Sequence, residues 1–186
     1  MLPDANLCEP GVLRSPDGKQ IAVLLRENSR KYNSFVIFSD DDHLVTVQTR
    51  IPELVEKLDR YPDLDLLAAM SNDEEGPRLL SIEDRVMRIR FAELSRHNNI
   101  ARCHYVGNCF AAYRDILQAI RWDESLKMEE HWDFFWRCKL AGVKVGVATD
   151  HAFKHEHIDP PGYVRRRPEF LRIGKQKYGL RKVVWK

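Results

Sequence analysis

The chain has 186 residues, of which 44% are hydrophobic and 31% charged, and its 30 Lys and Arg residues nearly balance 28 Asp and Glu residues for a formal charge of +2. This composition excludes an intrinsically disordered chain and leaves room for one domain of ordinary size. The small net charge argues against a protein whose whole surface binds nucleic acid. No apolar run approaches the roughly 18–20 residues that span a bilayer, the first residues do not resemble a signal peptide, and the four cysteines show no paired spacing, so we expect a reduced, cytoplasmic protein.

The first half of the chain alternates predicted helices and strands. Residues Ser15–Asp17 combine a capping hydroxyl, a proline and an acid, which predicts a helix that ends near Lys31. The apolar run 35–38 predicts a buried strand, residues 50–60 have helical spacing, and the apolar segment 64–70 predicts a second strand. Short alternating steps of this kind predict βαβ units and a mostly parallel sheet flanked by helices, which places the chain in the α/β class.

In the second half, Ser81 and Asp84 resemble a capping box, which predicts a helix to about Ser95. The other predicted elements are strands near residues 102–106, 108–112 and 143–148 and helices near residues 114–120 and 130–141. A Pro-Pro-Gly sequence follows, and the tail behind it is predicted to hold one amphipathic basic helix. We therefore divide the chain into a body, residues 1–162, and a tail, residues 163–186.

Three consecutive carboxylates, Asp40, Asp41 and Asp42, directly follow the first of these predicted strands. In an open parallel sheet, ligands bind beyond the carboxyl ends of the strands. In extended backbone Asp40 and Asp42 point to one side, where two carboxylates repel each other unless a cation lies between them. Oxygen ligands at this spacing suit Mg²⁺ or Mn²⁺, commonly shared with substrate phosphates. The alternative is a solvated acidic turn that caps the next helix.

A second polar cluster follows the strand predicted near residues 143–148. It consists of Asp150, His151 and the run His155-Glu156-His157, and it is expected at the carboxyl end of that strand. Neutral imidazole from this cluster would complete a Mn²⁺ site that the carboxylates begin. Taken alone, the same residues are compatible with a surface turn or with half of a zinc or iron site.

Three long stretches give the chain a resemblance to a known family. Residues 18–46 contain the acidic triplet, residues 106–147 contain the sequences WDESL and EHWDFFWR, and residues 150–157 read DHAFKHEH. In this order they resemble the later part of nucleotide-diphospho-sugar glycosyltransferases with the GT-A fold. The nearest groups are the family-2-like enzymes and the β-1,4-N-acetylgalactosaminyltransferases of the ganglioside GM2 synthase type.

By this resemblance the triplet is the family's DxD motif. Asp42 is then the direct metal ligand, Asp40 lies nearer the ribose and the metal, and Asp41 belongs to the donor site. His151 matches the late histidine that contacts metal or diphosphate, and His155 is a second candidate for that role. The resemblance implies a Mn²⁺ or Mg²⁺ cofactor, a nucleotide-sugar donor (a UDP-sugar above all) and a glycan, glycolipid or lipid-linked acceptor.

The resemblance also implies a base that deprotonates the acceptor hydroxyl in an inverting transfer. The segment Gly107-Asn108 and the start of the helix predicted near residue 130 match the acceptor side of the family's cleft. Glu130, His131 and Asp133 are the candidate bases, and His131 stands where the family commonly has its aspartate. Asp133 is favoured, because the ganglioside-type members read His-Leu-Glu-Phe-Phe where this chain reads His-Trp-Asp-Phe-Phe. Acids at a helix start also serve simply as partners of the helix dipole.

The resemblance predicts a shortened domain. Two βα units normally precede the DxD strand in this fold and form the pocket for the nucleotide base, whereas only residues 1–33 precede it here. The chain is therefore expected to be a fragment of a longer protein or an N-terminally shortened member. The alternative function is that of a non-catalytic remnant or binding module with the same fold.

The tail carries an excess of positive charge. Residues 163–186 hold nine basic residues and one acid, which leaves 21 basic and 27 acidic residues in the body. The simplest interpretation is a helix that covers the sheet with its charges in water. Alternatively, the tail contacts an anionic membrane surface or, less in keeping with the overall charge, nucleic acid. Its arginines, Arg165 among them, also suit the donor diphosphate, because guanidinium matches phosphate geometry.

Overall fold

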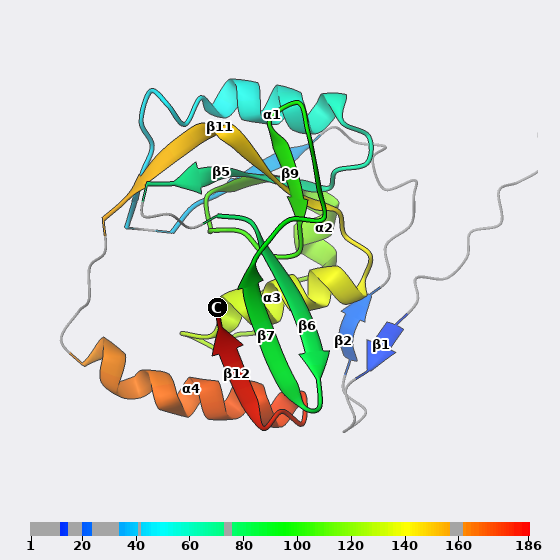
Figure 1. The fold of residues 1–186 in the computed structure, drawn as a ribbon, viewed down its shortest axis with the longest axis vertical. Coiled ribbons are helices and arrows are strands. Elements are labelled where there is room, and N and C mark those ends of the chain that lie inside the picture. Colours follow the sequence, from blue (N-terminus) through cyan, green and yellow to red (C-terminus); the bar gives the residue numbers. More distant parts are fainter. Residues whose placement is uncertain (1–11, 15–19, 24–33, 41, 73–75, 157–161) are drawn as a thin grey trace, which may run out of the picture.

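The computed structural model describes residues 12–14, 20–23, 34–40, 42–72, 76–156 and 162–186 (Figure 1). Its helices are α1 (Ile51–Arg60), α2 (Arg114–Ala119), α3 (Glu130–Leu140) and α4 (Tyr163–Lys177). The strands of its main sheet are β3 (Phe35–Phe38), β4 (His43–Leu44), β5 (Leu66–Ser71), β8 (Ser95–His97), β9 (Ile100–Cys103), β10 (Phe110–Tyr113) and β11 (Val145–His155). A second sheet contains β6 (Arg78–Glu83), β7 (Val86–Phe91) and β12 (Lys182–Trp185), and β1 (Val12–Arg14) pairs with β2 (Gln20–Val23).

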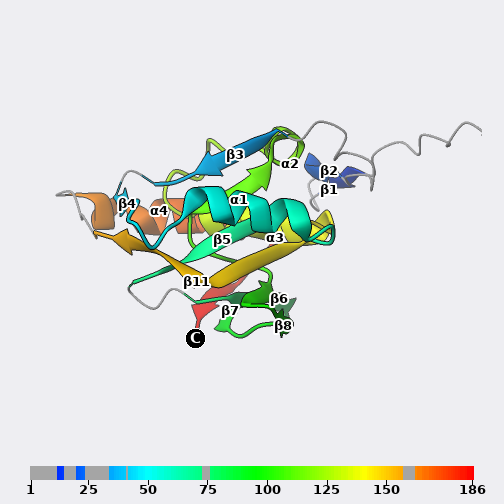
Figure 2. The ribbon, with the colours of Figure 1, turned by 90° about the horizontal axis from the view of Figure 1, so that it is seen from above.

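The main sheet has seven strands and lies between helices. Its order is β3-β10-β5-β11-β9-β8, with β4 paired to β11. In Figure 1, α1 lies above this sheet, and α3, the three-stranded sheet and α4 lie below it. Seen from above, α1 lies over the region between β3 and β11 (Figure 2). Leu54 and Leu58 of α1 and Phe134 and Phe135 of α3 are all 0–1% exposed, so each of these helices buries an apolar face.

Strand directions bring several chain segments to one edge of the main sheet. β10 runs antiparallel to both β3 and β5, and β5 runs parallel to β11. β3, β5 and β11 therefore point the same way, and their carboxyl ends share one edge with the start of β10. This edge receives Asp40 and Asp42 after β3, the segment 107–109 before β10 and the end of β11.

The α/β class and the flanking helices are confirmed, but the sheet is mixed rather than mostly parallel. Among the pairings of its described strands, only β5 with β11 is parallel. The alternation of short elements suggested βαβ crossovers throughout. It could not show that β10 enters the sheet in the reverse direction between β3 and β5, because that pairing joins segments far apart in the sequence.

The helix predicted from Ser81 to Ser95 is wrong, because this segment forms the β6–β7 hairpin. Glu83 pairs with Val86 across a two-residue turn, and Asp84 and Arg85 both have positive φ, at 51° and 61°. Such a turn matches the twist of a hairpin. The residues that resembled a capping box therefore belong to a β-turn, and the alternation of apolar and polar residues around it is that of strands.

The helix predicted from Ser15 to Lys31 is wrong over Gln20–Val23, which is strand β2. β2 pairs antiparallel with β1, and local helix signals cannot reveal such a partner. The remainder of that prediction, residues 15–19 and 24–31, lies outside the described residues.

The other predicted elements are confirmed with shifted ends. They are the strands predicted at 35–38, 64–70, 102–106, 108–112 and 143–148 and the helices predicted at 50–60, 114–120, 130–141 and in the tail. β11 continues beyond the predicted end at residue 148 to His155. β12 was not predicted, and it adds the tail to the three-stranded sheet by pairing parallel to β7. No helix in the described part of the chain is long and apolar enough to cross a membrane.

Candidate functional site

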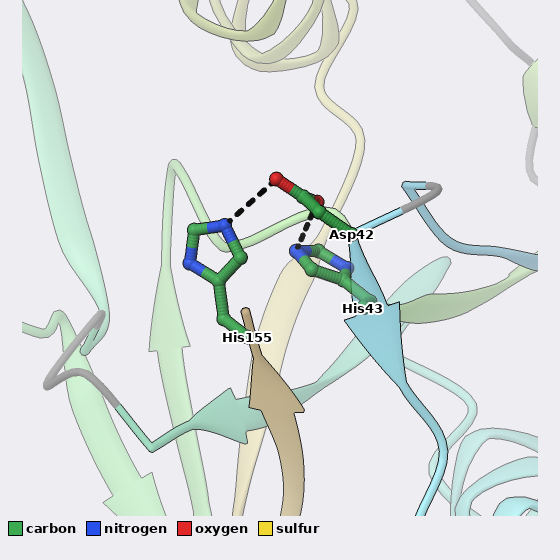
Figure 3. Close-up of side chains that lie close together, drawn as sticks. All are labelled: Asp42, His43 and His155. Carbon is green, nitrogen blue, oxygen red and sulfur yellow. Dashed lines mark hydrogen bonds and ion pairs between the residues drawn. The ribbon is translucent and has the colours of Figure 1, made fainter. Parts of the chain in front are cut away.

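Asp42, His43 and His155 form a cluster at the carboxyl edge of the main sheet (Figure 3). One potential ligand atom of each residue lies within 4.8 Å of those of the other two. His155 Nε2 is 3.1 Å from Asp42 Oδ2, and His43 Nε2 is 3.8 Å from Asp42 Oδ1. The two carboxylate oxygens thus each face one of two imidazole rings, whose centroids are 5.0 Å apart.

Strand pairing positions these three side chains. His43 of β4 pairs directly with His155 of β11, and cross-strand partners project on the same side. The Glu156 N–H donates to the Asp42 carbonyl at 2.9 Å, and the His155 N–H donates to Asn72 Oδ1 at 2.6 Å. The cluster is therefore fixed by the pairing of β4 with β11 and by the Asn72 side chain, which follows β5, rather than by its own side chains alone.

Both imidazoles of the cluster lie in a largely desolvated environment. The His43 side chain is 4% exposed and that of His155 is 10% exposed, whereas Asp42 is 24% exposed. Burial lowers the pKa of His43, and the nearby Asp40 and Asp42 carboxylates oppose this effect. His43 Nδ1 is buried and has no hydrogen-bond partner. A neutral imidazole is the form that binds metals, so one carboxylate and two imidazoles make a plausible donor set for a divalent transition ion.

Asp40 lies beside a second group of polar side chains. Asn108, which precedes β10, donates from Nδ2 to both Asp40 carboxylate oxygens at 3.2 and 3.0 Å. His131 at the start of α3 places Nε2 3.6 Å from Asp40 Oδ2 and 3.5 Å from Glu130 Oε1. Asp40 thereby links the edge of the sheet to the first turn of α3.

These residues form one wall of a cleft of about 300 Å³. The cleft is lined by Phe38, Asp40, Asn108, Trp122, Asp123, Glu124, Leu126, Lys127, Glu130 and His131. Burial raises the pKa of the Glu130 carboxyl, and the neighbouring Asp40, Glu129 and Asp133 carboxylates add to this effect. Glu130 Oε2 is buried without a hydrogen-bond partner. A carboxylate with these properties is a suitable proton acceptor.

Asp133, the favoured base from the sequence, occupies a different environment from Glu130. It is 0% exposed and accepts hydrogen bonds from Arg137 Nε at 2.8 Å, Lys177 Nζ at 2.6 Å and the Tyr178 hydroxyl at 2.6 Å. Lys177 and Tyr178 come from the end of α4 and the residue that follows it. Asp133 thus joins α4 to α3, and it is not among the residues that line the cleft.

His151 lies apart from the Asp42–His43–His155 cluster. Residues 149–151 form an irregularity in β11, because Ala148 pairs with Ala69 while Ala152 pairs with the next residue of β5. His151 Nδ1 is 2.9 Å from Asp150 Oδ1, and Lys57 Nζ of α1 is 2.6 Å from the same carboxylate oxygen. His151 and Asp150 therefore face α1.

The two remaining predicted site residues add little to this geometry. Asp41 lies outside the described residues, and Arg165 is exposed on α4. Sequence reasoning missed His43 as a member of the cluster. The available signal was the position of His43 directly after the acidic triplet. Spacing along the chain does not place His43 beside His155, whereas the pairing of β4 with β11 does.

Comparison with known proteins identifies a partial relative. No family model matches the chain. It is 30% identical over 155 residues to the beta-1,4 N-acetylgalactosaminyltransferase 1 of Rattus norvegicus and equally similar to that of Homo sapiens. Each alignment covers 74% of this chain and 28% of the relative, so the chain corresponds to little more than a quarter of their length. This similarity supports a relationship between the chain and a glycosyltransferase.

Proposed function

We propose that this chain forms the metal-binding and acceptor-side part of a glycosyltransferase that moves a sugar from a nucleoside-diphosphate donor to an acceptor hydroxyl. The observation that carries the proposal is the juxtaposition of the Asp42–His43–His155 cluster and the Glu130 cleft at one edge of the main sheet, with Asp40 between them. The similarity to a sugar-transferring enzyme supports the reaction class.

The donor set favours Mn²⁺ over Mg²⁺. Mg²⁺ prefers oxygen ligands in a near-ideal octahedron, whereas two of the three clustered residues offer imidazole nitrogen. Asp42, His43 and His155 would hold the ion, which would be shared with the donor phosphates. A divalent cation at this place would neutralise the charge that develops on the diphosphate as it leaves.

Glu130 is the base in this proposal. It lies in the cleft with a raised pKa, and His131 and Asn108 lie beside it near Asp40. As the acceptor oxygen bonds to the anomeric carbon and the bond to the diphosphate breaks, Glu130 takes the hydroxyl proton and the diphosphate leaves with the electron pair. Attack opposite the leaving group makes the transfer inverting. A positioned base of this kind contributes about 10²–10⁴-fold to the rate.

A nucleotide-binding experiment tests the donor half of the proposal. Calorimetric titration of UDP into the protein is expected to give binding with Mn²⁺ and none without it, and Asp42→Asn should abolish this Mn²⁺-dependent binding. Asp150→Asn is the matched control, because that carboxylate faces α1 instead. Mn²⁺-dependent UDP binding that survives Asp42→Asn would contradict the assignment.

A transfer experiment tests the base. Glu130→Gln is expected to retain Mn²⁺ and UDP binding while transfer from a UDP-sugar falls by about 10²–10⁴-fold. Wild-type protein that binds the nucleotide but transfers no sugar to any glycan acceptor would instead indicate a binding module without catalysis.

A further inference from the structure

The segment between α2 and α3, residues 120–129, forms much of the wall of the cleft that contains Glu130. Five of its residues line the cleft: Trp122, Asp123, Glu124, Leu126 and Lys127. This segment, which the structure describes throughout, contains no helix or strand, so its shape depends on contacts with its neighbours. The ring of Trp122 is the largest apolar group of the segment, and its centroid lies 4.1 Å from that of Phe134. The placement of Trp122 therefore determines the shape of the cleft.

Two cations hold the chain on either side of Trp122. Arg137 of α3 donates from a terminal guanidinium nitrogen to the Arg121 carbonyl at 2.6 Å. Lys177 of α4 donates from Nζ to Asp123 Oδ2, also at 2.6 Å. Both helices lie below the main sheet in Figure 1. The residues directly before and after Trp122 are thus each bound to a helix.

Both cations are anchored on the same buried acid. Arg137 Nε lies 2.8 Å from Asp133 Oδ2, and Lys177 Nζ lies 2.6 Å from Asp133 Oδ1. The Asp133 side chain is 0% exposed and that of Lys177 is 18% exposed. Charged hydrogen bonds are stronger where water is largely excluded. Asp133 is therefore a fixed point from which two cations extend to the wall of the cleft.

Asp123 transmits the contact with Lys177 to this wall. Its Oδ1 accepts from the Ser125 N–H at 2.9 Å and from the Ser125 hydroxyl at 2.6 Å, and its carbonyl accepts from the Leu126 N–H at 2.9 Å. These bonds close a compact turn. Both carboxylate oxygens of Asp123 thus have partners within the protein, and Lys177 is not among the residues that line the cleft. Lys177 therefore acts on the cleft through Asp123.

We propose that Lys177 is a positioning residue for the acceptor side of the cleft. By joining Asp133 to Asp123, it holds Trp122 in the wall against which the acceptor sugar packs, and the identity of that ligand rests on the function proposed above. An indole offers a broad apolar surface to the C–H face of a sugar ring. Its placement matters, because a displacement of about 1 Å in a group that positions the substrate lowers the rate by as much as about 10²-fold. The tail thus contributes to the site through Lys177.

Fluorine NMR of protein labelled with 5-fluorotryptophan tests the positioning without any need for activity. The four tryptophans give four signals, and Trp122→Phe identifies the one from Trp122. Lys177→Met is expected to shift this signal, and Lys177→Arg should restore it in part, because a guanidinium also binds carboxylates. The matched control is Tyr178→Phe, which removes a hydrogen bond from the same Asp133 but leaves the pair of Lys177 with Asp123 intact. This control should leave the Trp122 signal in place.

Transfer kinetics give a second readout. With UDP-N-acetylgalactosamine as donor and lactose as acceptor, Lys177→Met should raise the KM for lactose by about ten-fold, which lies within the usual range of coupling between contacting residues. The KM for the donor should stay unchanged. Asp123→Asn breaks the same pair from the side of the cleft and leaves Asp133 with both cations, so it should reproduce both effects even if Lys177→Met does not fold.

The proposal is overturned if the Trp122 signal keeps its wild-type position in both Lys177→Met and Asp123→Asn. It is also overturned if Tyr178→Phe shifts that signal as far as Lys177→Met does, or if the KM values for lactose and the donor rise together. Failure of the proposed function has a different signature. The wild-type protein then transfers no sugar, whereas the fluorine spectra still decide whether Lys177 positions Trp122.

Discussion

At the residue scale, two acids within one turn of α3 have opposite roles. Glu130 lies in the cleft with a raised pKa, whereas Asp133 is fully buried between Arg137, Lys177 and Tyr178. The sequence could place both acids near the helix start but could not tell them apart. Their roles depend on α4, which brings Lys177 and Tyr178 to Asp133.

This difference predicts opposite effects of the two amide substitutions. Asp133→Asn should lower the free energy of unfolding by about 3–5 kcal/mol, because it leaves the buried Arg137 guanidinium without its carboxylate partner. Glu130→Gln should leave stability unchanged within about 0.5 kcal/mol or raise it, because a desolvated carboxylate is removed. Urea denaturation measures both. Equal losses in the two variants would contradict the distinction.

His104 gives a pH-dependent prediction. Burial, with a further effect of the Lys139 ammonium, lowers its pKa from 6.5 to about 4, and the Leu80 N–H donates to its Nδ1 at 3.2 Å. Between pH 6.5 and about 4 the unfolded chain then binds a proton that the folded chain does not. His104 therefore makes stability fall as the pH is lowered through this window, with no further loss below it.

The measurement compares wild type with His104→Asn, whose side-chain oxygen can still accept from the Leu80 N–H. Urea denaturation across the window should show a shallower loss of stability in the variant than in the wild type. Parallel curves for the two proteins would refute the contribution of His104.

The candidate metal cluster was predictable in part. The acidic triplet and the late histidines pointed to Asp42 and His155, and the structure brings these two residues together. The irregularity at residues 149–151 of β11 turns His151 toward α1, and the β4–β11 pairing adds His43. Bulges and short strand pairs depend on distant segments, so spacing along the chain could not reveal either one.

At the element scale, α4 packs closely against α3. A Cβ on Gly174 would lie 2.6 Å from Trp132 Cζ2, well inside a normal contact. The Trp132 indole donates to Glu129 Oε2 at 2.8 Å, and Arg167 of α4 donates to Glu129 Oε1 at 2.9 Å. The tail helix was predictable from its basic amphipathic pattern, but this partner was not.

Gly174→Ala should therefore destabilise the protein although alanine favours helices. Overpacking against a buried indole costs about 1–3 kcal/mol, which exceeds the roughly 1 kcal/mol that alanine gains over glycine within a helix. Glu169→Ala, an exposed change in the same helix, is the control and should shift the melting midpoint little. A Gly174→Ala variant as stable as wild type would mean that α4 does not approach Trp132 so closely.

The β6–β7 hairpin shows where local signals failed. Serine and aspartate three residues apart are typical of helix starts and of turns alike. The apolar residues that alternate on both sides of Asp84-Arg85 distinguish a hairpin from a helix. They complete one face of a sheet whose third strand, β12, comes from the end of the chain.

At the scale of the whole molecule, the basic tail forms ion pairs with acids of the body. The tail's Lys177 binds Asp123 and Asp133 of the body, both at 2.6 Å, and Arg167 binds Glu129. Burial opposes ionisation of Asp123, but hydrogen bonds from Lys177 and Ser125 lower its pKa to about 2. Part of the tail's positive charge thus compensates acids of the body.

Removal of residues 163–186 should therefore abolish cooperative folding. The deletion would remove Lys177 and Tyr178 from Asp133, Arg167 from Glu129 and a strand from the three-stranded sheet. Circular dichroism of the truncated chain is expected to show no sigmoidal thermal transition. A transition with the wild-type midpoint would show that the tail is an independent appendage.

The central claim is that Asp42, His43 and His155 form one metal site, and electron paramagnetic resonance of a Mn²⁺ titration tests it most directly. We predict that His43→Gln weakens Mn²⁺ binding by more than about ten-fold. Mutation of a residue that only hydrogen-bonds to a metal ligand already lowers metal affinity by about ten-fold, and His43 would be a ligand itself. His151→Gln should leave binding unchanged, since His151 faces α1. Equal Mn²⁺ affinity in His43→Gln and wild type, or a larger loss in His151→Gln, would contradict the account.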